Sequence, residues 1–362
     1  MAFVPGVHLN PMRRRLPAER AQQLLGMFPA AQHISLSGCL APVPKLLDVI
    51  TTRDASRVHS LRLASNGLTL EHAEQLGEWL AASDGMELSA LDLSDNSICV
   101  SRGLGASAID ASGLRALLAP FAQLRTSRCT TGAKSPVRGG SGDSGGGGSG
   151  GGGSGEEVFG RADVRGSQHR LRRRAGPALL ELNLSGNQLC TAGAQALASS
   201  FRSSPALTCA SSGLRILSLA KCLIGTGGIA ALLPALKQCC ALSSLDLTSN
   251  FLYDEGASAV APWLAFASPR LEFVSLAFNG IGEEGANALH AAIEAKQTAA
   301  PQERSARHVG RDAPHASRLL TANLAGNNWN TRCNTAFFKL ADRHGIEIYV
   351  RDQRAFNLTT AY

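Results

Sequence analysis

The fold of this chain is decided by the stretch Leu179–Gly193, which reads LLELNLSGNQLCTAG. Its leucines and asparagine follow the pattern L-x-x-L-x-L-x-x-N-x-L, and an amphipathic run, Ala194–Phe201, comes after it. Leu182 and Leu184 alternate, so both side chains point to one face of a short extended strand. The amide of Asn187 can hydrogen-bond to backbone groups of neighbouring turns that no regular ladder satisfies. One such unit cannot bury its apolar face alone, so the pattern predicts further copies.

The copies are present on both sides of this stretch. Clear copies begin at Val58, Leu88, Leu214, Leu242 and Leu271, and weaker ones begin at Ala31 and Leu319. The shortest spacings between copies agree on a period of about 28 residues, which leaves room for a full helix after each strand. The expected helical halves, for example 68–80 and 256–264, carry apolar residues at spacings of three to four.

This period and pattern resemble the ribonuclease-inhibitor-like subfamily of leucine-rich repeats over residues 31–121 and 179–350. Ran GTPase-activating proteins and NLR-type receptors share the subfamily. The resemblance implies an α/β leucine-rich-repeat solenoid, a horseshoe with about eight short parallel strands on the concave side and helices on the convex side.

Five segments follow from the positions of the repeats. We expect an N-terminal arm or cap (1–30), a first block of repeats (31–124), a Gly/Ser/Arg-rich insertion (125–178), a second block (179–332), and a C-terminal cap and tail (333–362). In the cap, 333–344 reads as a helix that Gly345 ends, and 346–350 reads as a strand. If the two blocks form one array, Leu93 and Leu184 lie on neighbouring strands in spite of the insertion.

The formal net charge of +7 is concentrated outside the repeats. The insertion 125–178 holds ten basic and four acidic residues, and its composition predicts disorder. Its run of glycine and serine at 145–155 resembles an engineered linker, and we leave open whether it is native. The basic cluster at its end is either a solvated tether, the favoured interpretation, or a contact with acidic protein, RNA or an anionic surface. The cluster comprises Arg170, Arg172, Arg173 and Arg174.

Nine cysteines are present without a C-x-x-C pair or a Cys/His spacing typical of a metal site. Cys39 and Cys222 occupy the asparagine position of their repeats. The pattern therefore predicts reduced cysteines, no metal and an intracellular, cytoplasmic protein. Mitochondrial or cytoskeletal and ciliary targeting are left open, although the prolines in residues 1–30 disfavour a presequence helix. No apolar stretch approaches the ~20 residues of a membrane span.

The strand positions between the core leucines are expected to face solvent on the concave side. These positions and the loops just after them supply the candidate binding residues. Four are polar and four are aromatic, and interfaces use aromatic side chains as anchors. The candidates are Arg62, Asp92, Glu181, Asp246, Phe251, Tyr253, Phe273 and Phe278.

The chain carries no phosphate-binding Gly-Lys-Thr/Ser string and no paired-histidine motif, so we expect neither an enzyme nor a cofactor. Two acidic pairs, Asp254-Glu255 and Glu283-Glu284, precede expected helices. Acid/base catalysis by such pairs is one interpretation. Complementing the helix dipole with acids in the first turn is the favoured one.

The sequence thus predicts a monomeric, non-catalytic scaffold or adaptor that binds a protein partner through the concave face and rim loops. A first alternative is a Ran-type regulator of a small GTPase, for which Arg62 and Asn96 are polar candidates. A second is RNA or anionic-surface binding through Arg170–Arg174. Inhibition of a basic nuclease is disfavoured because this chain is itself basic.

Overall fold

The computed structural model describes residues 7–8, 23, 27, 31–38, 43–52, 54–82, 87–99, 110–123, 179–208, 213–267, 269–299 and 318–350. All the described elements belong to one compact unit, which residues 1–126 and 176–362 form. The predicted disorder of the insertion 125–178 and the predicted tail after residue 350 fall outside the described residues.

The described strands form one open sheet in which every neighbouring pair is parallel. The spatial order of the strands is their order in the chain, as a solenoid requires. The strands are β1 (Val7–His8), β2 (His33–Ser35), β3 (Ser60–Arg62), β4 (Ala90–Asp92), β5 (Glu181–Asn183), β6 (Ile216–Ser218), β7 (Ser244–Asp246), β8 (Phe273–Ser275), β9 (Thr321–Asn323) and β10 (Glu347–Tyr349).

The eight repeats predicted from the sequence supply strands β2 to β9, which confirms the fold class. The sheet nevertheless has ten strands rather than about eight. One addition, β10, is the strand expected in the C-terminal cap, and it pairs with β9. The other, β1, lies in the N-terminal arm, where Val7 pairs with Ile34. Two residues without a leucine pattern gave no signal for a strand there.

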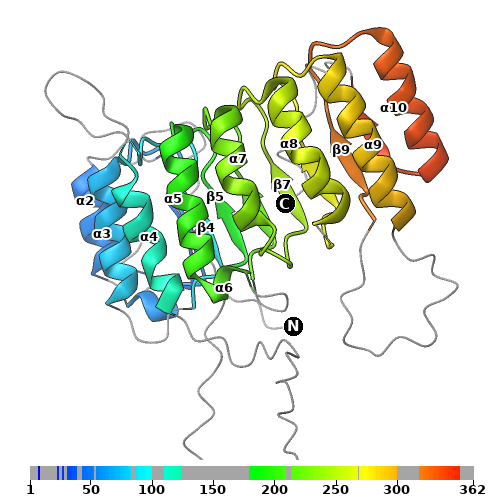
Figure 1. The fold of residues 1–362 in the computed structure, drawn as a ribbon. Helices are drawn as coiled ribbons and strands as arrows, with labels where there is room; N and C mark the ends of the chain where they lie inside the picture. Colours follow the sequence, from blue (N-terminus) through cyan, green and yellow to red (C-terminus); the bar gives the residue numbers. More distant parts are fainter. Residues whose placement is uncertain are drawn as a thin grey trace, which may run out of the picture. The chain divides into compact units, whose positions relative to one another are not determined.

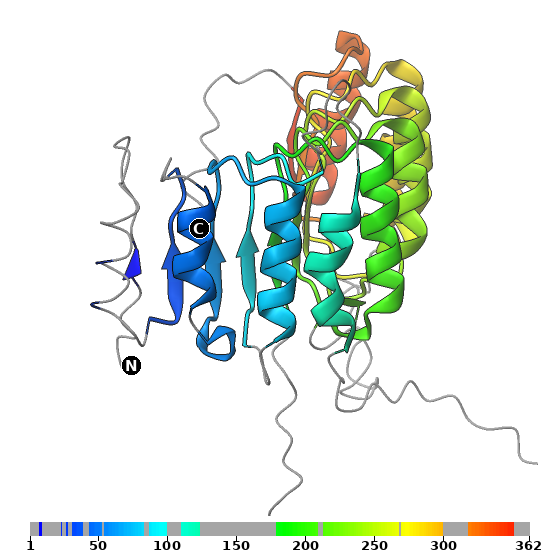
Figure 2. The same cartoon turned by 90° about the vertical axis from the view of Figure 1, so that its left-hand side faces the viewer.

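A helix follows most strands, and the helices lie side by side along one face of the sheet (Figures 1 and 2). The other face carries no helix among the described elements. The helices are α2 (Val43–Thr51), α3 (Leu70–Ala81), α4 (Ser112–Gln123), α5 (Cys190–Ser203), α6 (Pro205–Thr208), α7 (Gly225–Leu236), α8 (Tyr253–Phe266), α9 (Glu283–Ala299) and α10 (Thr331–His344), with a 3-10 turn at Ala55–Arg57.

The core lies between the helices and the sheet. The middle residue of each repeat strand points into it and is buried, because side chains alternate along a strand. These residues form one row across the sheet, in register, from Ile34 through Leu182 and Leu245 to Ala322. The recurring spacing of leucines in the repeat is therefore a packing pattern. The first and third residues of each strand do not enter the core and remain for other roles.

The array continues across the insertion without a break in register. Leu91 of β4 pairs with Leu182 of β5, and the N–H of Leu93 donates to the carbonyl of Asn183 at 2.9 Å. On the helix side, the Ser204 hydroxyl donates to the carbonyl of Phe121 at 2.8 Å. Leu93 and Leu184, predicted to lie on neighbouring strands, each come one residue after the end of the neighbouring strands β4 and β5.

Most repeats contribute one buried asparagine to a ladder that runs along the stack. The side-chain N–H₂ group of Asn96 donates to the carbonyls of Leu63 and Leu93 at 3.0 and 2.9 Å. Its Oδ1 accepts from the N–H groups of Asn66 and Leu68 at 3.1 and 2.9 Å. Each such amide satisfies backbone groups of two successive turns. The other members of the ladder are Asn66, Asn187, Asn250, Asn279 and Asn327.

Cys222 occupies the ladder position after Asn187, where it replaces the donor of the asparagine side chain but not its amide oxygen acceptor. Its thiol donates to the carbonyl of Leu184 at 3.2 Å. It offers no amide oxygen to the N–H groups of Asn187 and Leu189. The N–H of Asn187 instead donates to the carbonyl of Leu184 at a long 3.4 Å, and the N–H of Leu189 donates to the carbonyl of Asn187 at 2.6 Å.

Replacing Cys222 by asparagine is therefore expected to raise the free energy of unfolding by about 1 kcal/mol, the net value of a typical added hydrogen bond. The measurement is the urea midpoint at unchanged slope. Cys222→Ala, which removes the thiol and adds no acceptor, serves as the control and is expected to lower the midpoint. An asparagine variant no more stable than the alanine variant would contradict the ladder explanation.

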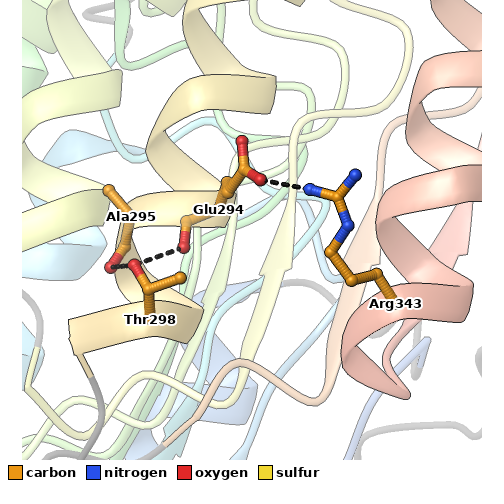
Figure 3. Close-up of polar contacts among 4 residues, drawn as sticks. All are labelled: Glu294, Ala295, Thr298 and Arg343. Carbon is orange, nitrogen blue, oxygen red and sulfur yellow. Dashed lines mark hydrogen bonds and ion pairs between the residues drawn. The ribbon is translucent and has the colours of Figure 1, made fainter.

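After the last repeat, the helix α10 and the strand β10 occupy the positions at which the sequence predicts a helix and a strand. Gly345 ends α10 in the left-handed conformation, with φ of 64°, and its N–H donates to the carbonyl of Ala341 at 2.8 Å. An ion pair between Arg343 of α10 and Glu294 of α9 links the cap to the last repeat (Figure 3). Both side chains are substantially exposed, so this pair contributes about 1 kcal/mol at most. The cap is held mainly by its apolar face, which includes Phe337 and Leu340.

Candidate functional site

The face of the sheet opposite the helices carries two rows of side chains. One row contains the first residue of each strand, such as Glu181, Ile216 and Phe273, and the other contains the third. Arg62 and Asp92 lie side by side in the second row. The polar candidates predicted from the repeat pattern are thus placed on the open face, where the alternation of the strands puts them.

Three of the four polar candidates meet at one shallow hollow on this face. Arg62, Asp92 and Glu181 line it together with Asn183 and Ser218, on strands β3 to β6. Its volume is about 190 Å³. The hollow combines one cation and two carboxylates with apolar lining from Ala90, Leu91, Leu182 and Ile216, so it offers both charged and apolar contacts to a partner surface. The fourth candidate, Asp246, lies on β7, two strands beyond β5.

Asp92 and Asp246 also have a structural role that the sequence did not reveal. Oδ1 of Asp92 accepts from the N–H and the hydroxyl of Ser94 at 3.0 and 2.7 Å. Asp246 accepts in the same way from Thr248 at 2.9 and 2.6 Å. Such aspartate-headed turns stabilise the end of a strand. One carboxylate oxygen of each residue is therefore committed to the fold.

The aromatic candidates occupy two places. Phe251 and Phe278 lie in the loops just after β7 and β8, and Tyr253 is the first residue of α8. All three are about half exposed, and the rings of Phe251 and Tyr253 are 6.4 Å apart, centroid to centroid. Phe273 begins β8, so it lies on the open face of the sheet, in the row between Ser244 and Thr321. The other three belong to the edge of the sheet where the strands end.

Sequence reasoning missed one member of this edge. Leu223 is 41% exposed and occupies the same place in its repeat as Phe251 does, one residue after the ladder position. A leucine inside a leucine-rich pattern gives no signal of its own. Its position relative to Cys222, rather than its residue type, identifies it.

The basic cluster Arg170, Arg172, Arg173 and Arg174 lies outside the described residues. The acidic pairs are described, and Asp254 has a specific partner. Its Oδ1 accepts from the N–H groups of Gly282 and Gly285 at 2.7 and 2.8 Å. This carboxylate of α8 therefore caps the start of α9 in the next repeat, a structural role close to the favoured interpretation.

Five of the described cysteines are poor nucleophiles. Burial raises the pKa of Cys99, Cys222 and Cys239 to about 12. It also raises the pKa of Cys190 and of Cys333. These thiols stay protonated at neutral pH, and the thiolate is the reactive form. Among the described residues, no cluster of three His, Cys, Asp or Glu side chains can hold a metal ion.

Comparison with known proteins identifies a leucine-rich repeat pattern in two parts of the chain. A sequence model of the leucine-rich repeat family matches residues 177–198 and 238–261, which contain β5 and β7. No curated protein matches the chain. Among solved structures, the leucine-rich repeat-containing protein LegL7 from Legionella pneumophila is 15% identical, with 85% of this chain and 70% of that chain covered and a TM-score of 0.42.

The parallel sheet, the helices on one of its faces and the asparagine ladder are the architecture of a leucine-rich-repeat solenoid. No described helix has both the length and the apolar character needed to cross a membrane. The open face and the loop edge of the sheet are two surfaces that the core does not use.

Proposed function

We propose that this protein is a non-catalytic scaffold or adaptor that binds a protein partner through the open face of its sheet and the adjoining loops. The observation that carries the proposal is the hollow at Arg62, Asp92 and Glu181. Solenoids of this type use the uncovered side of their sheet as an extended binding surface. We further assign the chain to the ribonuclease-inhibitor-like subfamily, on its period of about 28 residues, and infer a monomeric, cytoplasmic protein.

The polar rows on the open face are suited to specificity rather than to stability. Arg62 and Glu181 are the charged side chains of the hollow that have not been assigned to a turn. A charge that faces solvent in the free protein steers encounter with a complementary partner and penalises a wrong one. Mixed charge in one hollow favours a folded protein surface over a polyanion such as RNA, which basic clusters attract.

Regulation of a small GTPase is less well supported. Of its two polar candidates, Arg62 is exposed on the open face, but Asn96 is buried. The Asn96 amide already serves four backbone groups of the ladder. Such a residue cannot reach a bound GTPase without dismantling two turns.

The test is a charge reversal that keeps the net charge constant. In affinity purification with mass spectrometry from cells of the source organism, the variant Arg62→Glu, Glu181→Lys is expected to recover its partners at least tenfold less than the wild type. Reversing each charge of an attractive pair leaves repulsion in its place.

Two controls define the outcome. The variant Glu78→Lys, Arg115→Glu reverses two exposed charges on α3 and α4, on the helix side, and is expected to keep the partners. A chain lacking residues 125–176 tests the basic insertion. Loss of partners with that deletion or with the helix-side variant, and not with the open-face variant, would overturn the proposal.

A further inference from the structure

Three consecutive repeats place large apolar side chains at the loop edge of the sheet. Leu223, Phe251, Tyr253 and Phe278 are 41%, 52%, 52% and 48% exposed. They follow β6, β7 and β8, which are neighbours in the sheet. We call this set the edge patch. Parallel strands lie about 4.8 Å apart, so the patch extends for about 10 Å between its first and third repeats.

All four residues of the edge patch adopt the left-handed backbone conformation, with φ between 52° and 57°. This region is costly for side chains with a Cβ and favours glycine. The same conformation recurs at Ser65, Asp95, Cys190, Lys221 and Ser249, so it belongs to the turns of the repeat and not to the patch alone. The side chains of the edge patch do not enter the core, so packing does not explain why these residues are large and apolar. The backbone conformation does not explain it either, because it favours glycine.

The chain provides its own comparison. Where Leu223 and Phe251 stand in their repeats, another repeat has Gly67, also at positive φ. Where Phe278 stands, another repeat has Gly186. The fold therefore accepts glycine at these turns, and three successive repeats carry a large apolar side chain instead.

Two of the rings are held in place by glycines of the next repeat. A Cβ built on Gly280 would lie 3.0 Å from ring atoms of Tyr253, and one on Gly326 would overlap the ring of Phe278. Each ring rests on the neighbouring turn and stays half exposed. Ordered side chains lose little conformational entropy when they bind, which suits them as anchors.

The charge beside the edge patch is predominantly negative. Glu255 begins α8, and Glu283 and Glu284 begin α9, and all three are exposed. The corresponding residues of α5 and α7 are small or uncharged: Thr191, Ala192, Thr226 and Gly227. Acidic side chains therefore occur in the two repeats that carry the rings. The exposed cations Lys221 and Arg332 lie in the repeats on either side of these two.

From these observations we infer that the edge patch docks a cationic amphipathic segment of a protein partner. Apolar side chains on one side of that segment cover Leu223, Phe251, Tyr253 and Phe278, and lysine or arginine side chains beside them pair with the three glutamates. The inference rests on the proposed protein-binding function and specifies which part of the surface provides its apolar anchor.

The test uses a defined probe, a fluorescently labelled 16-residue amphipathic peptide made of leucine and lysine. Fluorescence anisotropy with the full chain gives its dissociation constant at two salt concentrations. A leucine and glutamate peptide with the same leucine pattern is expected to bind at least tenfold more weakly. So is a scrambled leucine and lysine peptide, which keeps the charge and loses the apolar face.

The decisive variant is Phe251→Gly, Phe278→Gly. Glycine relieves the backbone at both turns, so the fold is kept, and circular dichroism verifies it. The affinity for the cationic peptide is expected to fall at least tenfold. Phe266→Ala, which removes a 78% exposed ring at the end of α8, is the matched control and is expected to leave the affinity unchanged.

A second variant, Glu255→Gln, Glu284→Gln, addresses the charge alone. We expect a three- to tenfold loss of affinity and a weaker salt dependence. Equal binding by the wild type and the glycine variant would overturn the inference. So would a preference for the anionic peptide.

The same peptide separates this inference from the proposed function. Affinity that falls with Arg62→Glu, Glu181→Lys and not with the glycine variant would overturn the edge patch while supporting the open face. The opposite result has two parts: the glycine variant binds the peptide more weakly, and the Arg62→Glu, Glu181→Lys variant still recovers the cellular partners. That result would support the edge patch and overturn the open-face proposal.

Discussion

Replacing Asn187 by alanine is expected to lower the free energy of unfolding by about 3 to 5 kcal/mol. Asn187 is fully buried, and its amide N–H₂ donates to the carbonyls of Leu93 and Leu184 at 2.9 Å each. Its Oδ1 also accepts, at a long 3.4 Å, from the N–H of Ile98. Alanine removes these bonds, each worth about 0.5 to 1.5 kcal/mol net, and takes the acceptor away from the buried N–H of Ile98, which costs about 1 to 3 kcal/mol. The carbonyls of Leu93 and Leu184 keep one donor each, the amide of Asn96 and the thiol of Cys222.

The effect is large because of where Asn187 stands. It bonds to Leu93 and Ile98, which precede the insertion in the chain, so its loss weakens the contact between the two blocks of repeats. In a solenoid, stability depends on the interfaces between neighbouring repeats. Hydrogen exchange at Leu93, Leu184 and the surrounding turns should therefore accelerate more than exchange in α8 and α9.

The measurement is the urea midpoint together with residue-resolved hydrogen exchange. Asn328→Ala is the control, because Asn328 is exposed and follows the ladder residue Asn327. It is expected to change the free energy of unfolding by no more than about 0.5 kcal/mol. Equal effects of the two substitutions would show that the ladder adds nothing to the stack.

Much of the fold could be predicted because the same pattern occurs eight times in the sequence. A single leucine pattern is ambiguous, but eight copies fix the strands, the core face and the neighbour of each strand. The pairing of Leu91 with Leu182 follows from this even though an insertion separates them. Strand β1 could not be predicted, because Val7–His8 has no pattern and depends on the edge that β2 offers.

The candidate site was predictable only in part. Alternation along the strands placed Arg62, Asp92 and Glu181 on the open face, because that placement depends on backbone geometry alone. Whether Asp92 is free to bind or heads a turn depends on the hydroxyl of Ser94 two residues later. The repeat pattern does not encode that choice, and both residues are ordinary at a solvent-facing position.

The aromatic residues illustrate a different limit. Phe273 and Phe278 are five residues apart, and composition alone joins them into one patch. The structure places Phe273 on the sheet and Phe278 on a left-handed turn after it. Left-handed turns at Leu223 and Phe251 are unexpected from residue type, since glycine is the residue that favours them. Aligning the repeats could have indicated these turns, because Gly67 stands at the position of Leu223 and Phe251, and Gly186 stands at the position of Phe278.

Gly77→Ala is expected to lower the free energy of unfolding by about 2 to 3 kcal/mol, although helix propensity alone predicts the opposite sign. Alanine inside a helix is favoured over glycine by about 0.5 to 1 kcal/mol. At Gly77 of α3, however, a Cβ would lie 2.5 Å from the carbonyl oxygen of Ala116 in α4. That oxygen belongs to the backbone, so the whole helix must shift, and overpacking of this kind costs about 1 to 3 kcal/mol or more.

Gly227→Ala in α7 provides the matched comparison. A Cβ there meets only the side chain of Thr191, at 3.8 Å, so propensity is unopposed and the variant should gain about 0.5 kcal/mol. Urea midpoints of both variants, measured beside the wild type, decide between the two effects. Stabilisation by both substitutions would mean that α3 and α4 can separate freely. Opposite signs would show that the glycine at position 77 is set by the close approach of two helix backbones, which the leucine pattern of the repeat leaves unspecified.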